Sequence, residues 1–188
     1  MVAGLSKDDA RVNIENLIAE FYESENGFAG LGSYSEATEL PSPYNELLNH
    51  HAHMTVTVES HHGDKVDVVV HQHHRRSGVD GDWYAREITL QTQSTGKVVQ
   101  YGVVRLSVAA LAPEVWKRIE QQAAPLGRVL IEHNVLREVQ LCQLWKIQAG
   151  PALAGFLDTE VGTTVYGRTA LIYCDGEPAI ELLEVVAP

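Results

Sequence analysis

Two charged side chains fall on strand faces that are otherwise apolar. In the expected strand from Trp83 to Thr92, alternation puts Arg86 on one face with apolar neighbours: Tyr84, Ile88 and Leu90. In the expected strand from Pro178 to Val186, Glu184 likewise shares a face with Ile180, Leu182 and Val186. Because burying an unpaired charge costs several kcal/mol, we expect each charge either to have a partner or to line a cavity.

Two interpretations of this pattern stay open at the level of sequence. The charges can form a structural salt bridge with each other, or one strand can bury its opposite face. Alternatively, both line a pocket in which Arg86 grips a ligand carboxylate with two hydrogen bonds. A partly buried Glu184 would then serve as a general acid or base. Glu87 and Glu181 fall on the opposite faces, so we expect them in solvent.

Nine histidines suggest metal binding at first, but their spacing does not support it. Pairs such as His51 with His53 and His71 with His73 recur at strand-like spacing, without a nearby HExxH or CxxC pattern. We therefore expect structural or incidental roles for them and no metal. The nucleotide-binding and hydrolase patterns GxGxxG after a strand, GxxxxGK[ST] and GxSxG are also absent, and no cofactor is expected.

Composition limits the class of protein. The 188 residues, 45% of them apolar, suit one globular domain with an appended arm. A formal charge of -11 argues against nucleic acid and anionic membranes as partners. No apolar stretch is long enough to span a membrane, and the first ten residues do not resemble a secretory signal. Two isolated cysteines, Cys142 and Cys174, fit a reducing compartment, so we expect a cytoplasmic protein.

Hydrophobic periodicity predicts an α+β fold. Residues 11–24 have the spacing of an amphipathic helix, and residues 26–43 read as a linker, so we expect an arm over 1–42 and a domain over 43–188. Two further helices are expected, at 113–123 and 128–133. The expected strands pair mostly as hairpins and comprise residues 54–59, 66–73, 83–92, 97–106, 135–147, 164–174 and 178–186. This order predicts an antiparallel sheet of about six strands with helices on one side.

Several segments, in order, resemble the chorismate pyruvate-lyase family. The likeness runs from about Leu47 to Pro188, and the segments that carry it are WYAREI at 83–88, PLGRVL at 125–130, YGR at 166–168 and DGEP at 175–178. The family fold is an antiparallel six-stranded sheet with flanking helices, in agreement with the pattern above. The resemblance implies an enzyme that eliminates pyruvate from chorismate to give 4-hydroxybenzoate, without metal or organic cofactor.

The resemblance also implies roles for five residues. Arg86 matches the arginine that binds the ring carboxylate, and Glu184 matches the essential glutamate, which would move a proton. Met54 and Leu126 match residues whose backbone contacts the ligand, and Ile88 would line the pocket. The two charges selected by strand alternation are therefore the two that the resemblance selects.

One departure puts the substrate in question. Characterised bacterial members carry a second pocket arginine on the next strand, where this chain has Gly102, and Arg128 or Arg168 are candidates to replace it. Two alternatives therefore stay open: a non-catalytic binder of a small aromatic carboxylate, and an enzyme of this fold with another substrate. A sensing domain of a transcription regulator would need a basic DNA-binding segment, which the acidic first forty residues do not provide. The sequence leaves the oligomeric state open.

Overall fold

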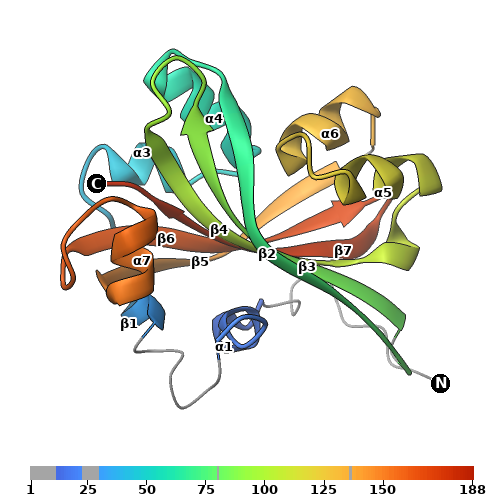
Figure 1. The fold of residues 1–188 in the computed structure, drawn as a ribbon, viewed down its shortest axis with the longest axis horizontal. Coiled ribbons are helices and arrows are strands. Elements are labelled where there is room, and N and C mark those ends of the chain that lie inside the picture. The colour runs from blue at the N-terminus through green and yellow to red at the C-terminus, as the bar shows by residue number, and fades with distance from the viewer. Residues whose placement is uncertain (1–11, 23–29, 80, 136) are drawn as a thin grey trace.

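The computed structural model describes residues 12–22, 30–79, 81–135 and 137–188. They form one antiparallel sheet in the order β1-β5-β6-β7-β4-β3-β2 (Figure 1). Its strands are β1 (Gly32–Ala37), β2 (Val66–Gly78), β3 (Gly81–Thr92), β4 (Val98–Ser107), β5 (Arg137–Ala149), β6 (Thr164–Cys174) and β7 (Glu177–Val186). The helical elements are α1 (Ile14–Ile18), α3 (Tyr44–Leu48), α4 (Met54–His62), the 3₁₀ turn η1 (Val108–Ala110), α5 (Pro113–Glu120), α6 (Leu126–Glu132) and α7 (Pro151–Phe156). The predicted α+β class with an antiparallel sheet is confirmed.

The two best-defined predicted hairpins are present. β3 pairs with β4 around the turn at residues 93–97, and β6 pairs with β7 around Asp175-Gly176. Both residues of this second turn have positive φ, 52° and 88°, which is the backbone that a two-residue hairpin turn requires and that Asp-Gly favours. Local turn chemistry therefore sets the register of the strands that carry Arg86 and Glu184.

The strand predicted at 54–59 is wrong, because this segment begins α4. Met54 and Val58 are four residues apart, a spacing that both a strand face and a helix face satisfy, and both side chains are buried. Val56, which would share the strand face, is 46% exposed. Gly63 then ends the helix in the left-handed conformation with φ of 64°. Consequently β2 pairs with β3 rather than with residues 54–59.

The segment predicted as a linker, 26–43, contains a strand. β1 pairs with β5 over six residues, from Gly32 opposite Ala149 to Ala37 opposite Leu144, so the sheet gains an edge strand. Gly32 is required there: its φ is 114°, and a Cβ would lie 1.9 Å from the carbonyl oxygen of Gln148. Helix α7 was also not predicted. The division of the chain at residue 42 remains a prediction.

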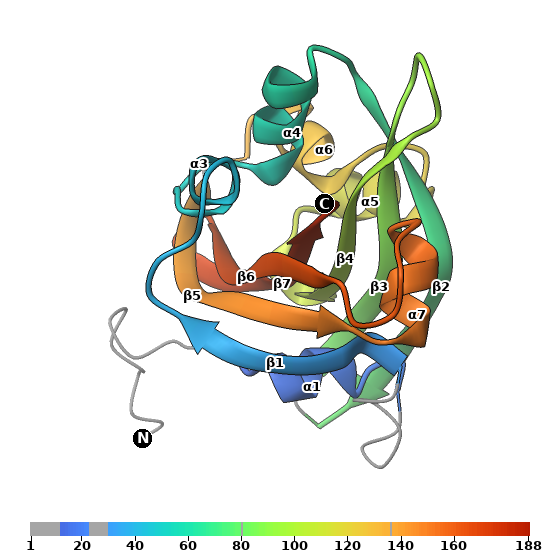
Figure 2. The ribbon, with the colours of Figure 1, turned by 90° about the vertical axis from the view of Figure 1, so that its left-hand side faces the viewer.

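Helices cover both faces of the sheet, not one face as predicted. Side chains of α3, α4, α5 and α6 pack on one face, and those of α1 and α7 pack on the other. Figure 2 shows α4 and α6 on one side of the curved sheet and α1 on the other. None of the described helices is long and apolar enough to cross a membrane.

The face beneath α1 buries a carboxylate that the sequence placed in solvent. Glu87 is 1% exposed and accepts hydrogen bonds from the hydroxyls of Tyr22 and Tyr101, both at 2.6 Å, and from Gln72 Nε2 at 2.8 Å. Burial, with Glu87 nearby, raises the pKa of Tyr101 well above its usual value, so this hydroxyl stays a donor. Glu181, also expected in solvent, is partly buried in an ion pair with Arg105.

We predict that Tyr101→Phe lowers the free energy of unfolding by about 1–3 kcal/mol, because it removes one donor from a buried carboxylate. Urea denaturation followed by circular dichroism measures the change. Tyr44→Phe is the control, since the Tyr44 ring is only partly buried against Tyr166. Equal stability losses in both variants would contradict the role given to the Glu87 network.

Candidate ligand-binding site

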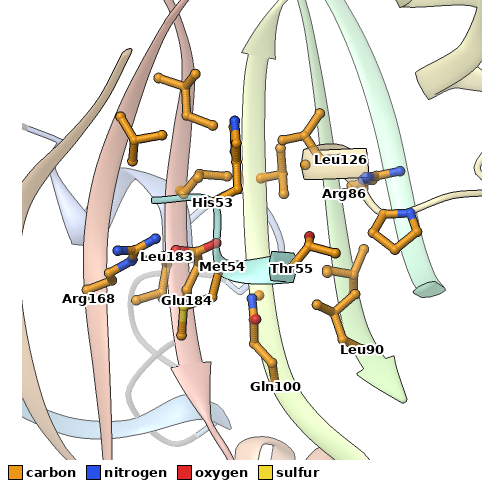
Figure 3. A pocket seen from close by; sticks show the side chains of 18 residues that line it. His53, Met54, Thr55, Arg86, Leu90, Gln100, Leu126, Arg168, Leu183 and Glu184 are labelled. Atoms are coloured by element: carbon orange, nitrogen blue, oxygen red, sulfur yellow. Dashed lines mark hydrogen bonds and ion pairs between the residues drawn. The ribbon is translucent and has the colours of Figure 1, made fainter. Parts of the chain in front are cut away.

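One small cavity lies between the sheet and the starts of α4 and α6. Its volume is about 30 Å³, which is room for one or two water molecules. All five residues selected from the sequence line it: Met54, Arg86, Ile88, Leu126 and Glu184. Figure 3 shows Arg86 beside Leu126 on one side of the cavity and Glu184 beside Arg168 on the other.

Strand register explains why the two charged side chains meet in one cavity without touching. Glu184 on β7 lies opposite Gly102 on β4, and Gly102 lies opposite Ile88 on β3. Arg86 is two residues from Ile88, so it points to the same face, two strands away from Glu184. Two strand spacings amount to about 10 Å, which is too far for direct pairing. The salt-bridge interpretation of Arg86 with Glu184 is therefore wrong.

Glu184 pairs with Arg168 on the neighbouring strand β6. Arg168 Nε donates to Glu184 Oε2 at 2.7 Å, and neither side chain is more than 9% exposed. The remaining nitrogens of Arg168 donate to backbone oxygens of residues that precede α4: Leu48 at 3.3 Å, His50 at 2.8 Å and Ala52 at 3.1 Å. One buried guanidinium thus holds Glu184 and also fixes the segment that leads into α4.

Arg86 is held very differently. The side chain is 0% exposed, and its Nε and Nη1 atoms have no hydrogen-bond partner among the residues that the structure describes. Burial lowers the pKa of Arg86, and the nearby Tyr84 opposes this effect in part. Even so, an arginine remains protonated near neutral pH. The cavity therefore contains a guanidinium that has no counter-ion among the described residues.

Two short helices form the cover of the cavity. Met54 and Leu126 are the first residues of α4 and α6, and both side chains are buried. The helices approach closely at Gly127, where a Cβ would lie 2.9 Å from Thr55 Oγ1. Arg128 reinforces this contact, because its Nη2 donates to Glu59 Oε1 at 2.6 Å and to the Val66 oxygen at 2.9 Å.

His53 lies between this small cavity and an open groove of about 780 Å³. Only His53 and Val139 line both spaces among the described residues. His53 Nε2 lies 2.6 Å from Arg137 Nε, which donates to it. Burial, followed by the charges of Arg137 and Arg168, lowers the pKa of His53 to about 4. His53 is therefore neutral near pH 7 and accepts this hydrogen bond.

Sequence reasoning missed two polar residues of the cavity. Gln100 lies on β4 on the same face as Gly102, and its buried Oε1 has no hydrogen-bond partner among the described residues. The signal was available, since Gln100 alternates with the buried Gly102 and Val104. His53 was considered only as part of a histidine cluster. Neither Arg128 nor Arg168 supplies a free cation in place of the arginine missing at Gly102, since both are bound to carboxylates.

Other histidines have local partners. His71 Nε2 lies 2.9 Å from Thr89 Oγ1, and His74 Nε2 lies 2.8 Å from Glu20 Oε2. Within the described ranges, no three His, Cys, Asp or Glu side chains are grouped as a metal site would need.

Comparison with known proteins shows the fold alone. No family model matches the sequence, and no curated protein matches it. Among solved structures, the effector domain of PhnF from Mycobacterium smegmatis is similar with a TM-score of 0.54 and 10% identity, over 72% of this chain and 88% of that one. A second structure of PhnF gives 0.52 and 10%, over 72% and 64%. A transcriptional regulator of the GntR family from Enterococcus faecalis V583 gives 0.47 and 9%, over 64% and 93%.

The similarity to the two PhnF structures identifies the architecture as a chorismate lyase-like α+β fold. At 10% identity it shows the fold alone and gives no support for membership of the chorismate pyruvate-lyase family. The fold expectation that came with the resemblance is thus confirmed.

The two buried arginines lead to opposite predictions for stability. Arg168→Met leaves Glu184 without its partner and should lower the free energy of unfolding by about 3–5 kcal/mol. Arg86→Met removes a charge that has no partner, so without ligand it should raise that free energy by about 1–3 kcal/mol. Urea denaturation at pH 7 measures both. A loss of stability in Arg86→Met as large as in Arg168→Met would show that Arg86 is also paired.

Proposed function

We propose that this chain binds a small organic carboxylate in the cavity and that Arg86 holds the carboxylate. The observation that carries the proposal is the buried guanidinium, whose Nε and Nη1 atoms have no hydrogen-bond partner among the described residues. A bound carboxylate would supply the missing charge and accept hydrogen bonds from the guanidinium. Because the Arg86 side chain is fully buried, this charge pair would be strong and selective for anions.

The lining supports a ligand with an apolar body, such as an aromatic or cyclohexadiene ring. Ile88, Met54 and Leu126 surround the space beside Arg86. The same fold serves as the effector domain of PhnF, which favours binding without catalysis as the first hypothesis. Backbone contacts of Met54 and Leu126 with the ligand remain part of this proposal.

A second candidate function is elimination of pyruvate from chorismate, and the position of Glu184 favours it. This carboxylate lines the same cavity as Arg86, as proton transfer to a bound substrate would require. Loss of one ring proton with expulsion of enolpyruvate needs only orientation and proton transfer. Against it, Oε2 of Glu184 already accepts from Arg168, and the cavity has no second unpaired cation among its described residues.

A ligand can be admitted only if a lining side chain moves, because the cavity holds no more than a water or two. Of the two residues shared with the open groove, Val139 is fixed in the hydrogen-bonded strand β5. His53 lies in the turn before α4, and its ring is held by Arg137. We therefore infer that the His53 ring swings aside to join the two spaces.

To test the binding proposal, wild type is titrated calorimetrically with benzoate, 4-hydroxybenzoate, cyclohexadiene carboxylates and aliphatic acids, beside the neutral amides. We expect carboxylates to bind and amides not to bind. Arg86→Met should weaken carboxylate binding by about 10- to 100-fold, as expected for a lost charge-assisted hydrogen bond. Arg105→Met is the matched control, because Arg105 lies on the opposite sheet face in ion pairs with Glu20 and Glu181.

The same samples are incubated with chorismate, and 4-hydroxybenzoate is followed by chromatography. Carboxylate binding without product supports the non-catalytic hypothesis. Product that disappears in Glu184→Gln supports the lyase. If no acid in the series binds and no product forms, although the protein is folded, both functions are wrong.

We predict that His53→Ala speeds both association and dissociation of a bound carboxylate several-fold, with a smaller change in affinity. Removal of the ring opens the cavity to the groove, so less motion is needed for access. Stopped-flow fluorescence measures the rates. His51→Ala is the control, since His51 lines the groove and not the cavity. Unchanged rates in His53→Ala would place the route elsewhere.

A further inference from the structure

The cavity contains a second kind of unmet hydrogen-bonding group, besides the Arg86 guanidinium. Only three buried side-chain atoms lack a hydrogen-bond partner among the described residues: Arg86 Nε, Arg86 Nη1 and Gln100 Oε1. All three belong to residues that line this one cavity. A buried amide oxygen without a hydrogen bond is destabilising, so a group retained in this state is a candidate ligand contact.

Gln100 and Arg86 stand at opposite ends of the cavity. Arg86 lies opposite Val104 on β4, and Gln100 is four residues from Val104 along the same strand. From the strand rise and spacing, their Cα atoms are roughly 14 Å apart. In Figure 3, Gln100 lies at one end near Leu90 and Thr55, away from the Arg86 guanidinium.

The strip between these ends is apolar toward β3, whereas Glu184 borders it on β7, opposite Gly102. Gly102 lies on β4 between Gln100 and Val104, so the sheet is bare there. A Cβ at this position would lie 3.4 Å from the Ile88 side chain and 3.3 Å from the Leu183 oxygen. Ile88 and Leu90 are the residues opposite on β3. An apolar ring laid along this strip would meet a polar group at each end, and the cover would have to move to admit it, because the cavity is only about 30 Å³.

We propose that Gln100 determines specificity by accepting a hydrogen bond from the end of the ligand that is remote from the carboxylate. This inference rests on the proposed binding of a carboxylate at Arg86. It narrows the ligand class to organic anions that carry a hydroxyl or amine group at the far end. A site built to bond such a group discriminates strongly against the analogue that lacks it, because the buried amide is then left unpaired.

The test compares matched acids that differ only at the far end: 4-hydroxybenzoate, benzoate and 4-methoxybenzoate, and an aliphatic hydroxy acid with its unsubstituted counterpart. Wild type should bind each hydroxy acid about 10-fold or more tightly than the acid that lacks the donor. Gln100→Met should abolish this preference while it keeps or improves the affinity for benzoate. Gln100→Glu, which retains an acceptor oxygen, should keep part of the preference.

Gln93→Met is the matched control, because Gln93 lies in the β3–β4 turn and bonds Asp67 outside the cavity. Thermal melts show that each variant is folded. If all acids bind through Arg86 with equal affinity, or if Gln100→Met keeps the preference, the inference about Gln100 is wrong and the binding proposal stands. If 4-methoxybenzoate binds as well as 4-hydroxybenzoate, the remote group is not a donor. If no acid binds, the binding proposal itself fails.

Discussion

A buried guanidinium with no counter-ion in the described part of the chain is the constraint on which the cavity depends. Strand alternation alone places Arg86 on the apolar face of β3. The register of β3 with β4 then puts Val104, and not an acidic residue, opposite Arg86. Burying such a charge costs desolvation free energy, and the packing of the surrounding fold must offset this cost. Well-packed clusters on both faces of the sheet can do so. Because the unpaired charge is unfavourable without a ligand, binding of an anion beside it is favourable.

The cavity keeps its shape because the other buried arginine is fully engaged. Arg168 bonds Glu184 and three backbone oxygens before α4, so the segment that leads into the cover helix is tied to the sheet. Without this tie, the cover could shift away from the sheet. Arg168 therefore has a structural role, whereas Arg86 is unpaired among the described residues. This difference distinguishes the cavity from an ordinary buried ion pair.

Much of this arrangement could be predicted from sequence, and the failures have local causes. Alternation assigned Arg86 and Glu184 to inward-facing positions, and both line the cavity, because successive side chains of a strand point to opposite faces. It failed at Met54–Glu59, since residues four apart share a face in both a helix and a strand. It also placed Glu87 in solvent, because alternation cannot reveal that α1 covers the other face. The partner of Glu184 was unpredictable for a similar reason: Arg168 lies on β6, and pairing across strands depends on register.

At Gly102 this chain departs from the lyase pattern, and this same position affects the charge distribution of the cavity. An arginine there would stand on the same sheet face between Arg86 and Gln100, and it would offer a second cation to the ligand. With glycine, positive charge is confined to one end, and the opposite end presents a neutral amide oxygen. Chorismate carries two carboxylates, whereas this cavity has one unpaired cation among its described residues. The charge pattern therefore suits a ligand with a single carboxylate better than a dicarboxylate, which is a physical reason to rank binding of a monoacid above chorismate elimination.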